Sequence, residues 1–111
     1  MKDNIVLIGM PSCGKSTIGV VLAKALGYRF VDSDLVIQER TGRLLSEIIE
    51  EEGLAVFNQI ENDTNASLDY HKAIIATGGS VIYGEEAMEN LRSIGTVVYI
   101  ELPFEVLKER I

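Results

Sequence analysis

The sequence has little of what marks a secreted, membrane-spanning or nucleic-acid-binding protein. A single cysteine excludes an internal disulfide framework and suits a reducing cytosol. No apolar run approaches the roughly 20 residues of a membrane span, and the amino terminus has no signal-peptide pattern. Ten basic residues stand against 17 acidic ones, and the net charge of −7 opposes general affinity for nucleic acid or anionic membrane. We therefore expect a cytoplasmic protein that has neither as a partner.

The length and the hydrophobic pattern predict one α/β domain over residues 1–111. Hydrophobic residues make up 47% of the 111 residues, which is enough for a core. Short apolar runs predict strands at residues 5–8, 28–32, 73–76 and 96–102. Helical patterns occupy residues 14–26, 35–40, 44–52, 54–68, 85–91 and 103–111. Strands that alternate with helices indicate a parallel sheet with right-handed crossovers.

Two of these helices carry apolar residues at helical spacing, which we expect to face the core. In the helix at 14–26 the stripe consists of Ile18, Leu22, Ala25 and Leu26. In the helix at 54–68 it consists of Leu54, Phe57, Ile60, Thr64 and Leu68.

The segment from Gly9 to Ser16 is a complete phosphate loop, with the pattern G-x-x-x-x-G-K-[ST]. It follows a predicted strand and precedes a predicted helix, which is the context that the motif requires. Its glycines let backbone N–H groups point inward as an anion nest, and the helix adds its positive dipole end. Lys15 can then reach the β- and γ-phosphates, and the Ser16 hydroxyl can ligate Mg²⁺. The motif predicts a nucleoside triphosphate site.

Two carboxylates, Asp32 and Asp34, flank Ser33 where the second predicted strand ends. Residues i and i+2 of an extended segment point the same way, and ligands of open α/β sheets bind at the carboxyl edge of the strands. Phosphoryl transfer needs a group that holds the metal and a group that orients the attacking hydroxyl. We assign these roles to Asp32 and Asp34. The alternative is a helix cap, which is the interpretation we favour for Ser33.

Taken together, these residues resemble the shikimate kinases, a family of small ATP-dependent kinases of the phosphate-loop class. The family loop G-x-P-x-x-G-K-S-T corresponds to residues 9–17, and its D-[ST]-D motif corresponds to residues 32–34. Its next conserved stretch is echoed in Ile37, Thr41-Gly42-Arg43, Glu47 and Ile48. Residues 97–100 and the helix that ends in Glu109-Arg110 also look like the family.

The resemblance implies an α/β fold with a parallel sheet flanked by helices, of the P-loop nucleoside monophosphate kinase type. The implied strand order is 2-3-1-4, and we expect the chain to lack the family's lid and final strand. The implied activity is ATP-dependent phosphoryl transfer to a hydroxyl of a small molecule, with shikimate as the best candidate. Mg²⁺ is the implied cofactor, ATP and ADP are the implied partners, and we expect a monomer.

The resemblance also assigns individual residues. Lys15 and Asp34 are the implied catalytic residues, and Ser16 and Asp32 are the implied metal ligands. The implied ATP-binding residues are Gly9, Pro11, Ser12, Cys13, Gly14, Lys15, Ser16, Thr17 and Arg110. The implied acceptor-binding residues are Asp34, Asn58, Gly78, Gly79 and Ser80.

The chain departs from the family where the acceptor is bound. The family pattern G-E-x-x-F-R-x-x-E keeps its glycine, phenylalanine and final glutamate here as Gly53, Phe57 and Glu61. Its first glutamate is replaced by leucine, and its carboxylate-binding arginine is replaced by Asn58. An amide offers no charge and weaker donation than a guanidinium, which can pair both oxygens of a carboxylate.

A third departure is Ser80, which stands where the family has the last glycine of G-G-G. Ser80 adds a side chain where backbone would otherwise approach the acceptor. Two alternatives therefore stay open beside a shikimate kinase. One is a related kinase with a different acceptor, and the other is a nucleotide-binding module without catalysis.

Overall fold

The computed structural model describes residues 3–9, 15–78 and 81–100. The elements follow in the order β1 (Asn4–Gly9), α1 (Lys15–Leu26), β2 (Arg29–Asp32), α2 (Ser33–Thr41), α3 (Leu45–Glu52), α4 (Leu54–Ala66), β3 (Ala73–Ala76), the short 3₁₀ helix η1 (Val81–Tyr83), α5 (Glu85–Ile94) and β4 (Gly95–Ile100). The helix predicted at residues 103–111 lies outside the described residues. No helix within the described ranges is both long and apolar enough to cross a membrane.

The four strands form a parallel sheet in the order β2-β3-β1-β4. Both the parallel sheet and the strand order implied by the resemblance are thus confirmed. The register aligns Leu7 of β1 and Asp32 of β2 with Ala76 of β3, so the three strands end at the same edge. The β1 strand lies in the interior of the sheet because its continuous apolar run tolerates burial on both faces.

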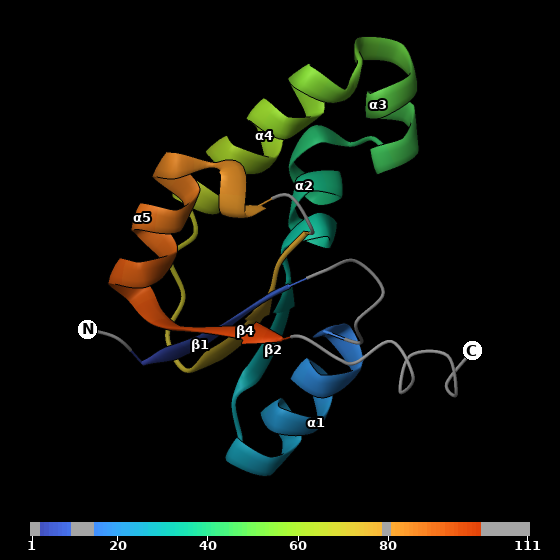
Figure 1. Cartoon of the computed structure of the whole chain (residues 1–111). Coiled ribbons are helices and arrows are strands. Elements are labelled where there is room, and N and C mark those ends of the chain that lie inside the picture. Colours follow the sequence, from blue (N-terminus) through green and yellow to red (C-terminus); the bar gives the residue numbers. More distant parts are fainter. Residues whose placement is uncertain (1–2, 10–14, 79–80, 101–111) are drawn as a thin grey trace, which may run out of the picture.

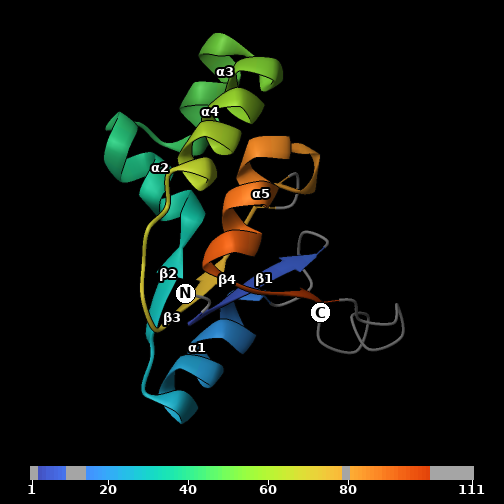
Figure 2. The same cartoon turned by 90° about the vertical axis from the view of Figure 1, so that its left-hand side faces the viewer.

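Helices cover both faces of this sheet, as Figures 1 and 2 show: α1 lies on one face and α5 on the other, and α4 packs beside α5. Alternate residues of each strand therefore enter different cores. Val6 and Ile75 pack against α5 residues such as Leu91, whereas Leu7 and Ile74 pack against α1.

The core-facing side of α1 differs from the predicted stripe. Gly19 and Ala23 are its buried residues, whereas Ala25 is exposed and Leu26 is 50% exposed. Gly19 matters because a Cβ there would lie 2.6 Å from Cε1 of Phe30. The helix therefore packs closely on β2 along its small residues, which the apolar spacing alone did not indicate.

The helices α2, α3 and α4 form a unit that rises beyond the carboxyl edge of the sheet (Figure 1). Its own small core contains Ile37, Ile48 and Phe57. Leu54 was predicted to join the inward stripe of α4, but it is 59% exposed. Figure 1 shows that the first turn of α4 lies beside α3 and away from the sheet.

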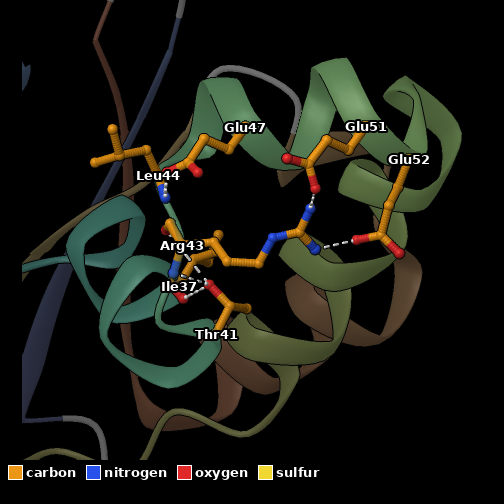
Figure 3. Close-up of polar contacts among 7 residues, drawn as sticks. All are labelled: Ile37, Thr41, Arg43, Leu44, Glu47, Glu51 and Glu52. Atoms are coloured by element: carbon orange, nitrogen blue, oxygen red, sulfur yellow. Dashed lines mark hydrogen bonds and ion pairs between the residues drawn. The ribbon is translucent and has the colours of Figure 1, made fainter.

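The connection between α2 and α3 is fixed by polar contacts (Figure 3). Thr41 Oγ1 donates to the carbonyl oxygen of Ile37 at 2.8 Å, and the Arg43 guanidinium donates to the carboxylates of Glu51 and Glu52. The Leu44 N–H donates to Glu47 Oε1 at 3.0 Å and so begins α3. Such exposed ion pairs contribute little to stability, and their main effect is to fix the turn.

At the opposite edge of the sheet, the buried side chain of Asn4 joins three segments. Its Nδ2 donates to the carbonyl oxygens of Tyr70 at 2.7 Å and Ile94 at 2.8 Å, and its Oδ1 accepts from the Ala73 N–H at 2.9 Å. The residue is 2% exposed, and the bond to the Ala73 N–H is fully buried. Asn4 thereby connects the starts of β1, β3 and β4.

Candidate active site

The candidate site lies at the carboxyl edge of three adjacent strands. Gly9 ends β1, Asp32 ends β2, and Thr77 and Gly78 follow β3. Both the N–H and the hydroxyl of Thr77 donate to the Leu7 carbonyl oxygen, at 3.2 and 2.9 Å. These bonds hold the exit of β3 against β1, which keeps the nucleotide and acceptor halves of the site in register.

The nucleotide half begins at Gly9 and continues at Lys15, the first residue of α1. Lys15 Nζ donates to the Gly9 carbonyl oxygen at 2.8 Å, so its ammonium lies at the start of the loop. Gly9 has a φ of +150°, and a Cβ there would overlap the Ile100 carbonyl oxygen. Only glycine fits this position. Ser16 and Thr17 follow in the first turn of α1 and are exposed.

The acidic pair has a different local geometry from the predicted one. Asp32 is the N-cap of α2, and its Oδ1 accepts a hydrogen bond from the Asp34 N–H at 2.9 Å. Ser33, which we favoured as the cap, is the first helical residue and is fully buried. Asp34 therefore lies in the first turn of a helix rather than on an extended segment, and a helix cap brings the two carboxylates together.

Asp34 lies in an unusual electrostatic environment. Burial raises the pKa of its carboxyl, the neighbouring Asp32 raises it further, and Lys15 lowers it by a smaller amount. Its Oδ1 is buried and has no hydrogen-bond partner among the described residues. A buried carboxylate oxygen without a partner, close to a lysine, is typical of a functional site.

Gly78 brings a second carboxylate to Asp34. A Cβ on Gly78 would overlap Glu61 Oε2 and would lie 3.1 Å from Asp34 Oδ1. Glu61 comes from α4 and is 3% exposed. Glu61 is not among the predicted site residues. Two features of the sequence could have indicated it: it keeps the final glutamate of the family pattern, and it is a charged residue next to the inward-facing stripe of α4. The two carboxylates thus approach the same glycine from α2 and α4.

Asn58 lies one turn before Glu61 on α4 and lines a cavity of about 320 Å³. The cavity lies between α4 and the segment of η1 and α5. Its lining residues are Ala55, Asn58, Gln59, Glu61, Asn62, Val81, Tyr83, Gly84, Glu85 and Glu86. They include amides and carboxylates but neither lysine nor arginine, so the described walls offer an anion no positive charge.

Several predicted site residues lie outside the described ranges. They are Pro11, Ser12, Cys13, Gly14, Gly79, Ser80 and Arg110. The structure places the other predicted site residues, among them Gly9, Lys15, Asp34 and Gly78, at one edge of the sheet. Asn58 lies on the helix α4.

The donor set at this edge fits Mg²⁺ that is shared with a nucleotide. Within the described ranges, no group of three or more His, Cys, Asp or Glu side chains could hold a metal by itself. Mg²⁺ is usually bound by one or two protein oxygens together with phosphates and waters. Asp32 and Ser16 supply oxygens of this kind, and the unpartnered Asp34 oxygen nearby can receive a donor from a bound ligand.

A parallel sheet in this order, with the phosphate-loop sequence after the interior strand β1 and acidic residues after the edge strand β2, defines the P-loop nucleoside monophosphate kinase fold. Within this class the chain belongs to the shikimate kinase family, because the family model for shikimate kinase matches residues 11–111.

Individual relatives agree with this assignment. The chain is 43% identical over 106 residues to a shikimate kinase of Clostridium botulinum (strain Eklund 17B / Type B), covering 95% of this chain and 64% of that relative. It is 40% identical to a shikimate kinase of Nostoc sp., covering 97% and 60%. The solved structure of the Acinetobacter baumannii shikimate kinase in complex with shikimate superposes with a TM-score of 0.85 at 35% identity, covering 99% and 62%. The Aquifex aeolicus enzyme gives 0.81 at 38% identity, covering 93% and 62%. The chain thus spans less than two thirds of these proteins.

Proposed function

We propose that the protein transfers the γ-phosphoryl group of ATP to a hydroxyl of a small molecule, with shikimate as the acceptor. The observation that supports this most directly is the half-buried Asp34 carboxylate, whose buried Oδ1 lies close to Gly78 and whose pKa is influenced by Lys15. One edge of the sheet then holds a group for the phosphates, a group for the metal and a group for the acceptor. These are the three parts that phosphoryl transfer requires.

In the nucleotide half, Lys15 neutralises charge on the transferring phosphoryl group. Its ammonium is already held at the mouth of the loop by the Gly9 carbonyl oxygen, 2.8 Å away. Phosphate oxygens are stronger acceptors than a backbone carbonyl, so the nucleotide draws the ammonium toward the β- and γ-phosphates. Bound Mg²⁺ neutralises further phosphate charge, and Ser16 and Asp32 are the residues that would hold it.

In the acceptor half, Asp34 accepts a hydrogen bond from the attacking hydroxyl and takes its proton. The raised pKa suits this role because a base works best when its pKa approaches the operating pH. The absence of a side chain at Gly78 lets the Glu61 and Asp34 carboxylates approach the same point of the site.

A transfer assay tests this proposal. Protein, ATP, Mg²⁺ and shikimate should release ADP and form a phosphorylated product, and each omission should stop both. Asp34→Asn should abolish product formation. Asp69→Asn makes the same chemical change at an exposed position before β3 and should leave the rate unchanged. ADP release at the same rate with and without the acceptor would contradict the proposal, and nucleotide binding without any ADP release would favour the non-catalytic nucleotide-binding module.

A second candidate is a kinase whose acceptor lacks a carboxylate. It is favoured by Asn58 at the wall of a cavity whose described lining has carboxylates but no basic residue. A comparison of shikimate with the analogue that carries a hydroxymethyl group in place of the carboxylate separates the two. A higher kcat/KM for the analogue would move the assignment to a neutral acceptor.

A further inference from the structure

The helix α5 is capped by a side chain that belongs to a different helix. Its own N-cap residue, Gly84, offers no side-chain acceptor. Instead, Asn62 of α4 accepts a hydrogen bond at Oδ1 from the Ala87 N–H at 3.0 Å, which is the bond that an N-cap side chain normally makes. The same amide donates from Nδ2 to Glu86 Oε2 at 2.9 Å.

Gly84 is what allows this approach. A Cβ at that position would overlap Asn62 Oδ1. The hydrogen bond from Asn62 lowers the pKa of the Glu86 carboxyl, so the pair stays an amide with an ionised partner. Both the oxygen and the nitrogen of the Asn62 amide therefore make a hydrogen bond to α5. Because hydrogen bonds are directional, the two bonds together fix the rotation of α4 relative to α5.

A second amide fixes the far end of the same helix pair. Asn90 of α5 donates to the carbonyl oxygens of Asn65 at 2.8 Å and of Leu68 at 3.0 Å. These carbonyls belong to the end of α4 and the turn after it. Asn62 and Asn90 thus hold α4 at two points, but only Asn62 lies next to the residue that reaches the acceptor site.

That residue is Glu61, whose Oε2 lies against Gly78 beside Asp34. Successive side chains on a helix are separated by about 100°, so the rotation that places Asn62 on α5 also determines where Glu61 points. A rotation of α4 about its axis that broke the Asn62 contacts would move Glu61 away from Gly78. Asn62 and Glu61 also line the same cavity as Asn58.

We propose that Asn62 is a positioning residue of the acceptor site: by capping α5 it holds Glu61 against Gly78 and shapes the wall next to Asn58. This inference rests on the proposed acceptor function of that edge. The amide of Asn62 is engaged by Ala87 and Glu86 of α5, and its effect on the site passes through Glu61.

The test compares three variants in the longest natural form of the protein. Asn62→Ala removes both hydrogen bonds and should raise the KM for the acceptor about five- to tenfold, with the KM for ATP within twofold. Asn62→Asp keeps the cap on Ala87 but sets two carboxylates against each other, and it should raise the acceptor KM as well. Adding Glu86→Gln to Asn62→Asp restores a donor–acceptor pair with reversed roles and should return the acceptor KM to the wild-type value.

Asn90→Ala is the matched control because it removes two hydrogen bonds from the other end of the same helix pair. It should lower the Tm about as much as Asn62→Ala and leave the acceptor KM unchanged. Equal effects of Asn62→Ala and Asn90→Ala on the acceptor KM, or no rescue by Glu86→Gln, would overturn the proposal.

A measurement without ligand keeps this test independent of the proposed function. The backbone amide signal of Gly78 in the NMR spectrum should shift in Asn62→Ala, return in the double variant and stay in place in Asn90→Ala. If the wild type phosphorylates no acceptor while these signals behave as expected, the proposed function fails and the positioning of Glu61 stands. If the Gly78 signal has the same position in Asn62→Ala as in the wild type, the positioning role of Asn62 is refuted, whatever the activity of the variants.

Discussion

Gly78→Ala is the sharpest test of the convergence of two carboxylates on one glycine. The added Cβ would overlap Glu61 Oε2 and would lie 3.1 Å from Asp34 Oδ1. The φ of Gly78 is not among the positive values, so an alanine can adopt its backbone conformation. The only direct consequence of the substitution is therefore the displacement of side chains at the site.

The effects on stability and on transfer should differ in size. An extra methyl group in a packed site costs about 1–3 kcal/mol, and the lower entropy of the unfolded alanine chain offsets about 0.4–1 kcal/mol. The overlapping atom is the free end of the Glu61 side chain, which can rotate away, so we expect the low end of that range. A shift of about 1 Å in a site group, however, can reduce the rate about 100-fold.

The assay combines thermal unfolding with acceptor kinetics. Gly78→Ala should lower Tm by a few degrees and reduce kcat/KM for the acceptor by about 100-fold, while the affinity for ATP stays within threefold. Gly27→Ala provides the control, since Gly27 has a φ of +71° with open space around it. A backbone strain of about 1–2 kcal/mol there should lower Tm without a change in acceptor kinetics. If both variants lose activity only in proportion to their unfolded fraction, the convergence at Gly78 has no role in catalysis.

Four further outcomes are expected. Nucleotide with Mg²⁺ at about 100 times its Kd should stabilise the protein by about 2.7 kcal/mol, and Lys15→Ala should remove most of this gain; thermal melts that ignore millimolar nucleotide would contradict the loop assignment. Asp34→Asn should leave nucleotide binding nearly intact while transfer is lost, whereas Asp32→Asn should weaken the Mg²⁺ dependence; equal losses of nucleotide affinity would show that the roles are divided wrongly. Because the Asp34 pKa is raised and only its deprotonated form acts as a base, kcat/KM should fall with decreasing pH at a higher pH than for an ordinary aspartate. Asn58→Arg should tighten shikimate by about 1.5–3 kcal/mol per charge-assisted bond, as measured by calorimetry, if a carboxylate waits in that pocket; no gain would favour the acceptor without a carboxylate.

Most of the fold could be predicted from local pattern, because each element is marked by nearby residues. The apolar run at the start of the chain is continuous, which indicates a strand buried on both faces. The end of α1 at Gly27, with its φ of +71°, likewise has a local signal. The strand order is predicted from the family resemblance, because the residues of one strand do not indicate which strands it pairs with.

The errors arose where tertiary contacts decide. Leu54 has the right spacing for the inward stripe, but α4 begins beyond the sheet and the Leu54 side chain stays exposed there. Ser33 and Asp32 are both good caps, and burial of the serine hydroxyl settled the choice against it. Glu61 is missing from the predicted site residues because a glutamate on a helix usually faces water, whereas the structure buries it against Gly78.

The amide of Asn4 has a consequence for how the chain is made. Its partners are at residues 70, 73 and 94, so β1 leaves the ribosome well before the residues that anchor it. At roughly 5–20 residues per second, the most apolar strand waits several seconds for its neighbours. During that interval β1 is an unpaired hydrophobic segment with two open edges, which is the kind of segment that chaperones bind and that aggregates form around. Synthesis from the amino end thus exposes the centre of the sheet before its flanks exist.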